Sequence, residues 1–281
     1  MKIFVTGGTG FIGSNFLNKV ISEGHEVIAL KRSKSSQPRV ELVQEPIWIT
    51  RQLDELLVED FTGVDVIVHF AAHSMTPPYD TLENCIQWNV VAPISAFKKA
   101  IEAGVKKFIV AGSCFEYGLS GENYEFIPPD APLVPTLTYA VSKASASMAF
   151  VQLALEKNIQ LSIQRIFHVF GPGESDNRLW PSLKLAAQNG KDFPMTEGDQ
   201  LRDFIHVDKV VQRFYELCCD KEIPFGSPLI ENLGSGRSQS VLEFSQFWWN
   251  KWDATGKLLI GEMPYREGEV MRYVPAIVKP I

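Results

Sequence analysis

Closely spaced glycines near the start of the chain constrain the fold more than any other sequence feature. In VTGGTGFIGS, Gly7, Gly10 and Gly13 lie three residues apart, and Gly8, Gly10 and Gly13 also fit GxGxxG. An apolar strand-like run precedes these glycines. A segment with apolar residues at helical spacing follows them and ends at Gly24, and EVIAL, just after it, predicts a second strand. In such a βαβ unit, backbone N–H groups and a helix N-terminus bind a pyrophosphate. The segment therefore predicts a dinucleotide-binding turn, and the alternative is an incidental glycine turn.

Apolar strands and amphipathic helices continue to alternate through more than half of the chain. Repeated βα units of this kind indicate an α/β fold built on a Rossmann-type doubly wound parallel sheet, with helices on both faces. The expected strands are 64–72, 106–113 and 160–171, and the expected helices are 81–103 and 138–157.

The alternation breaks after Gly171. A turn-rich segment and a helix at 181–189 come next, then a strand-like piece and a helix within 202–219, and a strand, a glycine turn and a helix within 229–252. We therefore expect a small, interleaved C-terminal substrate lobe. The expected division is 1–171 and 205–230 for the dinucleotide-binding domain, and 172–204 and 231–281 for the lobe.

Composition and charge exclude several classes of protein. The chain has 281 residues and a net charge of −6, which disfavours a general attraction to nucleic acid or to an anionic membrane. Its four cysteines form no CxxC pair, a pattern typical of reduced thiols. No apolar run approaches a membrane span, and the first residues do not resemble a signal peptide. We expect a cytoplasmic protein without a metal site.

The end of the second strand bears on the choice of cofactor. NAD sites usually carry an acidic residue there for the ribose hydroxyls, whereas this chain has Lys31 and Arg32. Two cations suit the 2′-phosphate of NADP, which an arginine can bind through paired hydrogen bonds. The pattern favours NADP over NAD; the alternative is a solvated basic loop.

A serine, a tyrosine and a lysine form the candidate catalytic group. Tyr139 and Lys143 are four residues apart at the start of a helix and so share one face. A nearby ammonium lowers the pKa of a phenol, so Tyr139 is expected to exchange a proton near neutral pH. Ser113 ends a predicted strand and can hydrogen-bond the same reacting oxygen.

These motifs occur in a characteristic order. TGGTGFIG, HFAA, WNVVAP, GSCFEYG, TYAVSK, RIFHVFGPG and RDFIHVD follow one another along nearly the whole chain. Their order resembles the extended short-chain dehydrogenase/reductase family, in its nucleotide-sugar epimerase/dehydratase/reductase branch. The resemblance implies that Ser113, Tyr139 and Lys143 are catalytic, and that Asp65 or its neighbours lie near the adenine. The cofactor-binding residues that it implies are Gly7, Gly10, Phe11, Ile12, Gly13, Lys31, Arg32, Ala71, Ala72, Asn89, Tyr139 and Lys143.

The same resemblance suggests where a nucleotide sugar binds. Arg202 and Arg266 match arginines that clamp the diphosphate in relatives, although Arg266 could instead be a surface residue beside Glu267 and Glu269. His168 stands where many relatives have asparagine, and its alternative role is structural. The candidate substrate residues are His73, Ser74, Met75, Cys114, Phe115, His168, Asn177, Arg178, Arg202 and Arg266.

The residues that follow Ser113 limit which reactions of this family the chain can catalyse. Sugar 4,6-dehydratases place Asp-Glu there, and 3,5-epimerising enzymes place a cysteine two positions after the serine, whereas this chain has Cys114 and Phe115. Glu116 is expected to point away, on the opposite face of a strand from Phe115. A 4-ketoreductase or a 4-epimerase remains, and Lys31 and Arg32 favour an NADPH-dependent reductase, closest in pattern to NDP-4-keto-6-deoxysugar 4-reductases.

Rival classes are a non-catalytic dinucleotide-binding protein and a reductase of ketones that carry no nucleotide. The complete Ser-Tyr-Lys set disfavours the first, and the paired arginines disfavour the second. Relatives commonly dimerise through the helix that carries YxxxK and the helix before it. We therefore expect a homodimer formed through helices 81–103 and 139–157.

Overall fold

The computed structural model describes residues 1–266 and 268–277. Its centre is a sheet of seven parallel strands in the order β11-β6-β5-β4-β1-β2-β3. The chain reverses direction across the sheet between β1 and β4, which is where ligands bind in folds of this kind. The strands are β1 (Lys2–Thr6), β2 (Glu26–Lys31), β3 (Ile47–Thr50), β4 (Val66–His69), β5 (Lys107–Ser113), β6 (Gln160–Ile166) and β11 (Leu229–Leu233).

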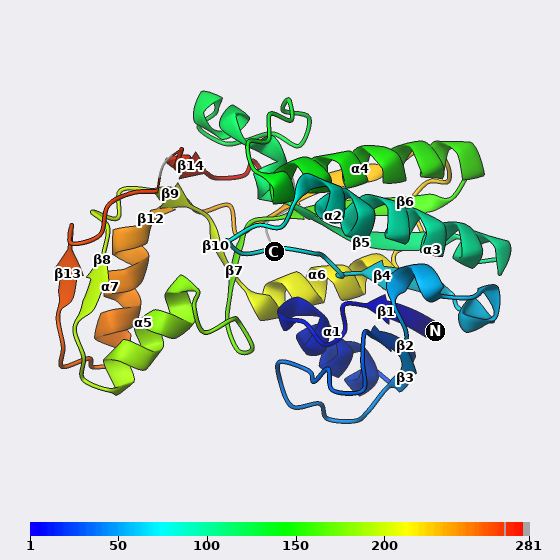
Figure 1. The fold of residues 1–281 in the computed structure, drawn as a ribbon, viewed down its shortest axis with the longest axis horizontal. Helices are drawn as coiled ribbons and strands as arrows, with labels where there is room; N and C mark the ends of the chain where they lie inside the picture. Colours follow the sequence, from blue (N-terminus) through cyan, green and yellow to red (C-terminus); the bar gives the residue numbers. More distant parts are fainter. Residues whose placement is uncertain (267, 278–281) are drawn as a thin grey trace.

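Helices cover both faces of this sheet (Figure 1). On one face, α1 (Phe11–Ser22) packs beside α6 (Val207–Cys219). The other face carries α2 (Leu82–Ile86), α3 (Ala92–Glu102) and α4 (Thr138–Lys157). The predicted doubly wound α/β fold is therefore confirmed.

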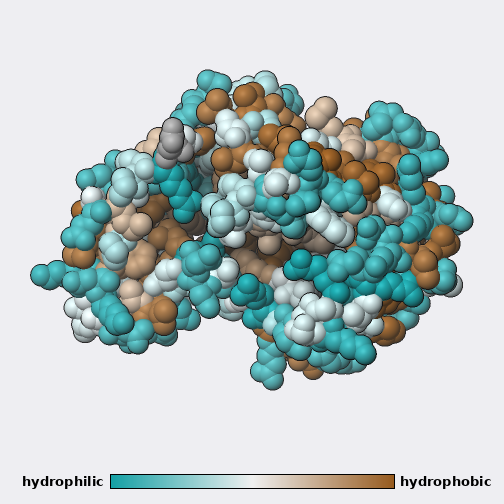
Figure 2. Space-filling model, viewed as in Figure 1, coloured by the Kyte–Doolittle hydropathy of each residue, from teal (hydrophilic) through white to brown (hydrophobic). Residues whose placement is uncertain are grey.

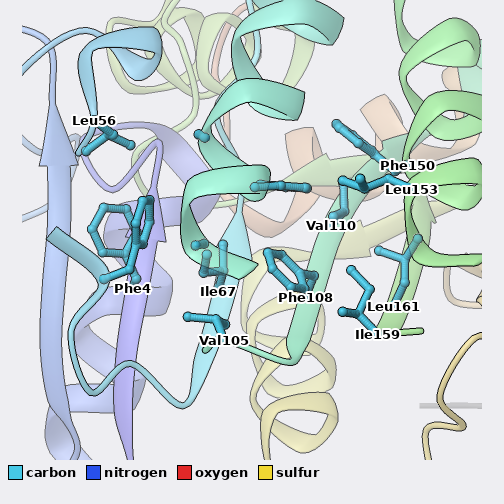
Figure 3. Close-up of a cluster of buried hydrophobic side chains, with 14 of the residues drawn as sticks. Phe4, Leu56, Ile67, Val105, Phe108, Val110, Phe150, Leu153, Ile159 and Leu161 are labelled. Carbon is cyan, nitrogen blue, oxygen red and sulfur yellow. The ribbon is translucent and has the colours of Figure 1, made fainter. Parts of the chain in front are cut away.

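Side-chain alternation along the strands sorts apolar residues into two cores. Phe4 of β1 points to the face covered by α3 and α4, where it joins Ile67 and Phe108 (Figure 3). Its neighbours Ile3 and Val5 point to the other face and pack with α1 and α6. Since both faces are buried, the strands are almost continuously apolar, as parallel strands require.

The remaining elements form a smaller layer beside the carboxyl ends of the main strands (Figure 1). Three small sheets pair β7 with β10, β8 with β13, and β9 with both β12 and β14. Aromatic side chains from α5, α7 and β7 pack together in this lobe, among them Phe170, Trp180 and Trp248. The elements are β7 (His168–Phe170), α5 (Leu179–Gln188), β8 (Phe193–Met195), β9 (Leu201–Arg202), β10 (Phe204–His206), β12 (Gln239–Ser240), α7 (Val241–Lys251), β13 (Leu258–Ile260) and β14 (Arg272–Tyr273).

The division into two domains stays a prediction. The expected boundary at residue 230 falls within β11, which pairs with β6 over its full length in the main sheet. Residues 278–281 of the expected lobe lie outside the described residues.

Several element boundaries differ from the sequence prediction. The expected strand 160–171 divides into β6 and β7, because β7 leaves the main sheet and pairs with β10. The expected helix 81–103 is interrupted at Gln87–Val91 by a π-helical turn. β3 was not predicted, because it is a short edge strand whose residues are exposed or half-buried and lack a clear apolar alternation.

Short 3₁₀ segments connect the larger elements. They are η1 (Leu53–Glu55), η2 (Val58–Phe61), η4 (Cys114–Tyr117) and η5 (Leu119–Asn123), and η3 is the π-helical turn. Within the described residues, no helix combines the length and the apolar character needed to cross a membrane.

Candidate active site

The glycine turn between β1 and α1 is shaped by backbone atoms that approach too closely for a side chain. Gly7 has a φ of +71°, and a Cβ there would lie 2.6 Å from the backbone nitrogen of Ala71. A Cβ on Gly13 would lie 2.1 Å from the carbonyl oxygen of Gly7. Gly10 is the N-cap of α1 and offers no side-chain cap, so the first N–H groups of the helix are left for another acceptor. The turn thus fits a pyrophosphate.

A cleft with a volume of about 230 Å³ opens from this turn toward the small lobe. The molecular surface is hollowed between the lobe and the sheet (Figure 2). The cleft brings together most of the expected cofactor, catalytic and substrate residues. Those that line it are Gly7, Gly10, Phe11, Ile12, Gly13, Ala72, Met75, Ser113, Cys114, Phe115, Tyr139, Lys143, His168 and Arg178.

The three candidate catalytic residues reach the cleft from two elements. Ser113 is the last residue of β5, and its Oγ accepts a hydrogen bond of 3.2 Å from the backbone N–H of Phe115. Its hydroxyl proton can therefore still be donated to a ligand. Tyr139 and Lys143 lie on the first turns of α4, and Lys143 Nζ donates to the carbonyl oxygen of Ala111 at 2.8 Å.

The expected acidification of Tyr139 is wrong for the protein as described. Burial raises the pKa of Tyr139 above its ordinary value, and nearby Ser113 opposes this rise only in part. Burial also lowers the pKa of Lys143. The ammonium of Lys143 is held by the oxygen of Ala111, and the field of Glu116 further favours the neutral phenol. Tyr139 is therefore a protonated phenol that can donate.

Glu116 positions the backbone of Ser113, a role that its sequence position did not predict. It lies in η4, not on a strand, and its Oε1 accepts a hydrogen bond of 2.9 Å from the backbone N–H of Ser113. Its Oε2 binds Arg165 Nε at 2.9 Å, and both side chains are almost completely buried. Spacing alone suggests a capping box here, but the partner Arg165 on β6 is distant in sequence.

Two residues on the substrate side of the cleft, Cys114 and His168, are in neutral form. Burial raises the pKa of the Cys114 thiol to about 12, so Cys114 carries no charge near neutral pH. Burial and the field of Arg202 lower the pKa of His168 well below its ordinary value. The Nδ1 atom of His168 is buried and has no hydrogen-bond partner among the described residues. Phe115 lies edge-on to the His168 ring at 6.2 Å.

The arginines expected to bind a diphosphate lie in different surroundings. Arg202 is buried; its guanidinium donates to Glu269 Oε1 and to the carbonyl oxygen of Val270, both at 2.7 Å. Arg266 is exposed, and Glu267, which was expected to lie beside it, is outside the described residues. Neither arginine lines the cleft, whereas Arg178 does.

The loop after β4 is braced by hydrogen bonds at the edge of the cleft. His73 Nε2 pairs with Asp80 Oδ2 at 2.7 Å, and Ser74 Oγ accepts a bond from the backbone of Asp80. The side-chain amide of Asn89 binds both the N–H and the carbonyl oxygen of His73, and also Ser142 Oγ. Asn89 lies in the π-helical turn, a distortion frequent at functional sites. It contacts protein groups and does not line the cleft.

Tyr79 extends from the same loop across Tyr139. The two rings are parallel within 8°, with centroids 6.3 Å apart. The charges of Arg266, Arg178 and Glu269 all act on the Tyr79 phenol. No sequence motif singled out this residue, because the stack depends on a loop conformation.

The other expected cofactor and substrate residues lie outside the cleft lining. Lys31 Nζ lies 5.0 Å from the centre of the Trp48 ring, and Arg32 is exposed at the end of β2. Asp65 Oδ2 accepts a hydrogen bond from the backbone of Lys2. The backbone N–H of Ala71 donates to Thr6 Oγ1, and Asn177 is exposed.

Fold and cleft together define a dinucleotide-binding α/β protein of the short-chain dehydrogenase/reductase type. A family model described as the NAD dependent epimerase/dehydratase family matches residues 3–221. The chain belongs to this family, as its motifs predicted.

Individual relatives show how far this likeness extends. A UDP-glucose 4-epimerase of Neisseria meningitidis serogroup C is 30% identical over 280 residues, covering 86% of this chain and 80% of the relative. A CDP-abequose synthase of Salmonella muenchen is 24% identical over 274 residues, covering 96% and 87%. The solved structure of MoeE5 in complex with UDP-glucose and NAD has a TM-score of 0.84 at 24% identity, covering 99% of this chain and 90% of that one. That structure confirms the fold.

The glycine turn gives a test of the cofactor site. We expect Gly13→Ala to weaken the binding of NADH and NADPH by about ten-fold or more, because overpacking against Gly7 O displaces the turn. Gly8→Ala is the matched control, since its Cβ would meet side-chain atoms and no backbone: methyl groups at 3.2 and 3.3 Å and a ring carbon of Trp48 at 3.6 Å. Titration followed by dinucleotide fluorescence measures the affinity of both variants. Equal losses of affinity in the two variants would contradict the role assigned to the close approach of Gly13 to the carbonyl oxygen of Gly7.

Proposed function

We propose that the protein reduces the 4-keto group of a nucleotide-linked 6-deoxy sugar with NADPH. The observation that carries this proposal is the shared cleft, in which Ser113, Tyr139 and Lys143 lie beside the glycine turn. The turn fits a dinucleotide, because its backbone excludes side chains at Gly7 and Gly13 and leaves the N-terminus of α1 uncapped. When bound, the reduced nicotinamide supplies a hydride to carbon 4.

Tyr139 supplies the proton to the developing alkoxide. Burial keeps its phenol protonated, which is the form that a ketoreductase needs at the start of turnover. Ser113 donates its free hydroxyl proton to the same oxygen and orients the ketone. The buried ammonium of Lys143 stabilises the phenolate left behind and holds the ribose of the cofactor.

The dehydration of the sugar is disfavoured by the side chains after Ser113. Neither Phe115 nor the Cys114 thiol, with its pKa near 12, provides the acid and base that the elimination of water needs. Glu116 is unavailable, because both of its carboxyl oxygens bind groups of the protein and its side chain is buried.

The nucleotide sugar is proposed to occupy the lobe side of the cleft. Its diphosphate is bound by arginines: Arg178 lies in the lining, the field of Arg202 acts on His168, and that of Arg266 acts on Tyr79. The Arg202–Glu269 pair must then open or share its guanidinium with the phosphate. The sugar contacts the expected residues His73, Ser74, Met75, Cys114, Phe115 and His168, and Asn177 contacts the nucleotide.

An NAD-dependent 4-epimerase is the second candidate. It is favoured by the likeness to the Neisseria epimerase and by the placement of Lys31, which stacks on Trp48. An epimerase begins by removing a proton from a hydroxyl, which requires the phenolate that burial of Tyr139 disfavours. A non-catalytic dinucleotide-binding protein is the third and weaker candidate.

Turnover tests the reaction directly. We expect stoichiometric oxidation of NADPH with one of the CDP-, UDP-, GDP- or dTDP-linked 4-keto-6-deoxy sugars, and a loss of about 10²–10⁴-fold in kcat for Tyr139→Phe. Tyr215→Phe, in α6 and outside the cleft lining, is the control. Interconversion of 4-epimers without net NADPH oxidation would support the epimerase, and the absence of both reactions would favour the binding protein.

Replacement of Lys31 and Arg32 by alanine tests the choice of cofactor. Loss of a charge-assisted phosphate contact of about 1.5–3 kcal/mol should raise KM for NADPH by roughly ten-fold or more, and leave KM for NADH nearly unchanged. The exposed Lys106→Ala is the control for net charge. Equal changes for the two cofactors would defeat the NADP assignment.

We further propose a homodimer formed through residues 81–103 and 139–157. Apolar side chains on this surface are exposed, including Val91, Met148 and Leu155. Sedimentation should give twice the chain mass of 31.5 kDa, and Met148→Glu should give the monomer. Leu185→Glu, at a comparably exposed position of α5, should leave the dimer intact. A monomeric wild-type protein would overturn this assignment.

A further inference from the structure

Glu174 is a buried carboxyl group in the cleft that the proposed reaction does not use. It lies in the turn between β7 and α5, its side chain is 8% exposed, and it belongs to the cleft lining. Its Oε2 atom is buried and has no hydrogen-bond partner among the described residues. An unpaired buried carboxyl oxygen is costly, so its persistence in a ligand cleft calls for a partner.

The protein holds the Glu174 carboxyl group in place but gives its Oε2 atom no hydrogen-bond donor among the described residues. The turn is fastened to α1, because Asn15 Nδ2 donates to the carbonyl oxygen of Pro172 at 2.9 Å. Arg178 Nε lies 3.7 Å from the other carboxyl oxygen, too far for a good hydrogen bond. Burial raises the pKa of Glu174 to about 7, and Arg178 and the backbone of Gly171 oppose this rise. Among the described residues, Arg178 is the charged group whose field reaches this carboxyl.

The chemistry of the unpaired atom limits what can bind there. A carboxylate oxygen accepts hydrogen bonds and repels phosphate, so its partner must be an N–H or O–H donor. Both ligands of the proposed function carry such donors: the nicotinamide has a carboxamide N–H, and the sugar has hydroxyl groups.

We propose that Glu174 is a ligand-binding, specificity-determining residue whose free carboxyl oxygen accepts a hydrogen bond from an amide N–H or a hydroxyl of the bound ligand. This inference rests on the proposed function only in that the cleft binds the cofactor and the sugar. A purely structural role, in which Glu174 serves only to neutralise Arg178, is the alternative.

If Glu174 accepts a hydrogen bond from the ligand, the affinity for that ligand must depend on pH in one direction. A donor binds the carboxylate more strongly than the neutral acid, so ligand binding lowers the pKa of Glu174. Ligand affinity must therefore rise as the pH increases through the pKa of Glu174, about 7 in the free protein. Glu174→Gln keeps the shape of the side chain and removes its titration.

The experiment measures ligand dissociation constants between about pH 6 and pH 8, on both sides of the pKa of about 7. The cofactor arm compares NADH with its reduced acetylpyridine analogue, which lacks the amide donor. The sugar arm compares UDP-glucose with UDP, and repeats the comparison with CDP-, GDP- and dTDP-glucose and their diphosphates. The variants are Glu174→Gln and Glu174→Ala, with the exposed Glu222→Gln as control.

In one arm, we expect wild-type affinity to increase with pH, and Glu174→Gln to abolish this increase. Glu174→Ala should weaken binding about ten-fold or more in the same arm. Dependence on the amide identifies the nicotinamide as the donor, and dependence on the sugar identifies a hydroxyl. An unchanged pH profile in Glu174→Gln for both arms, or affinity that falls with rising pH, would overturn the proposal. Binding needs no turnover, so failure of the proposed reaction would be seen separately.

Discussion

The close contact between Gly13 and the carbonyl oxygen of Gly7 is the constraint on which the site depends. It lets α1 begin directly beneath the turn that leaves β1, with no side chain between helix and strand. Gly7 also abuts the backbone at Ala71, just beyond β4, so the turn lies where the direction of the sheet reverses. The uncapped helix N-terminus, the end of β4 and the end of β5 thereby border one cleft.

Around this backbone frame, buried polar contacts position the groups that perform chemistry. The ion pair between Glu116 and Arg165 fixes the backbone of Ser113, and Asn89 holds both backbone polar groups of His73. Removing one partner of the buried Glu116–Arg165 pair leaves an uncompensated charge and costs about 3–5 kcal/mol. They let the reacting side chains meet a ligand without first reorganising the strand ends.

Burial also determines the protonation states in the cleft. It disfavours the phenolate of Tyr139, the thiolate of Cys114 and the imidazolium of His168. Neutral groups around the proton donor, with the buried ammonium of Lys143 beside it on α4, suit the donation of a proton. This protonation state supports the proposed ketoreductase, and the family likeness keeps the epimerase as the alternative.

Much of the fold and part of the site could be predicted, because both follow from local patterns. The glycine spacing, the apolar alternation and the Tyr139–Lys143 spacing each depend on neighbouring residues, and the structure brings them into one cleft. Contacts between distant segments could not be predicted in this way. Three such features arise only when separate elements pack: the hydrogen bond from Lys143 to Ala111, the ion pair of Glu116 with Arg165, and the burial of Glu174. The strands of the small lobe are two or three residues long, too short for a periodic signal.

A crystal structure of the protein with NADPH tests the central claim most directly. The account predicts that the pyrophosphate lies at the first N–H groups of α1, that Lys143 Nζ reaches the nicotinamide ribose, and that the Tyr139 hydroxyl faces carbon 4 of the nicotinamide. A dinucleotide bound elsewhere, or a Tyr139 hydroxyl directed away from the nicotinamide ring, would contradict it.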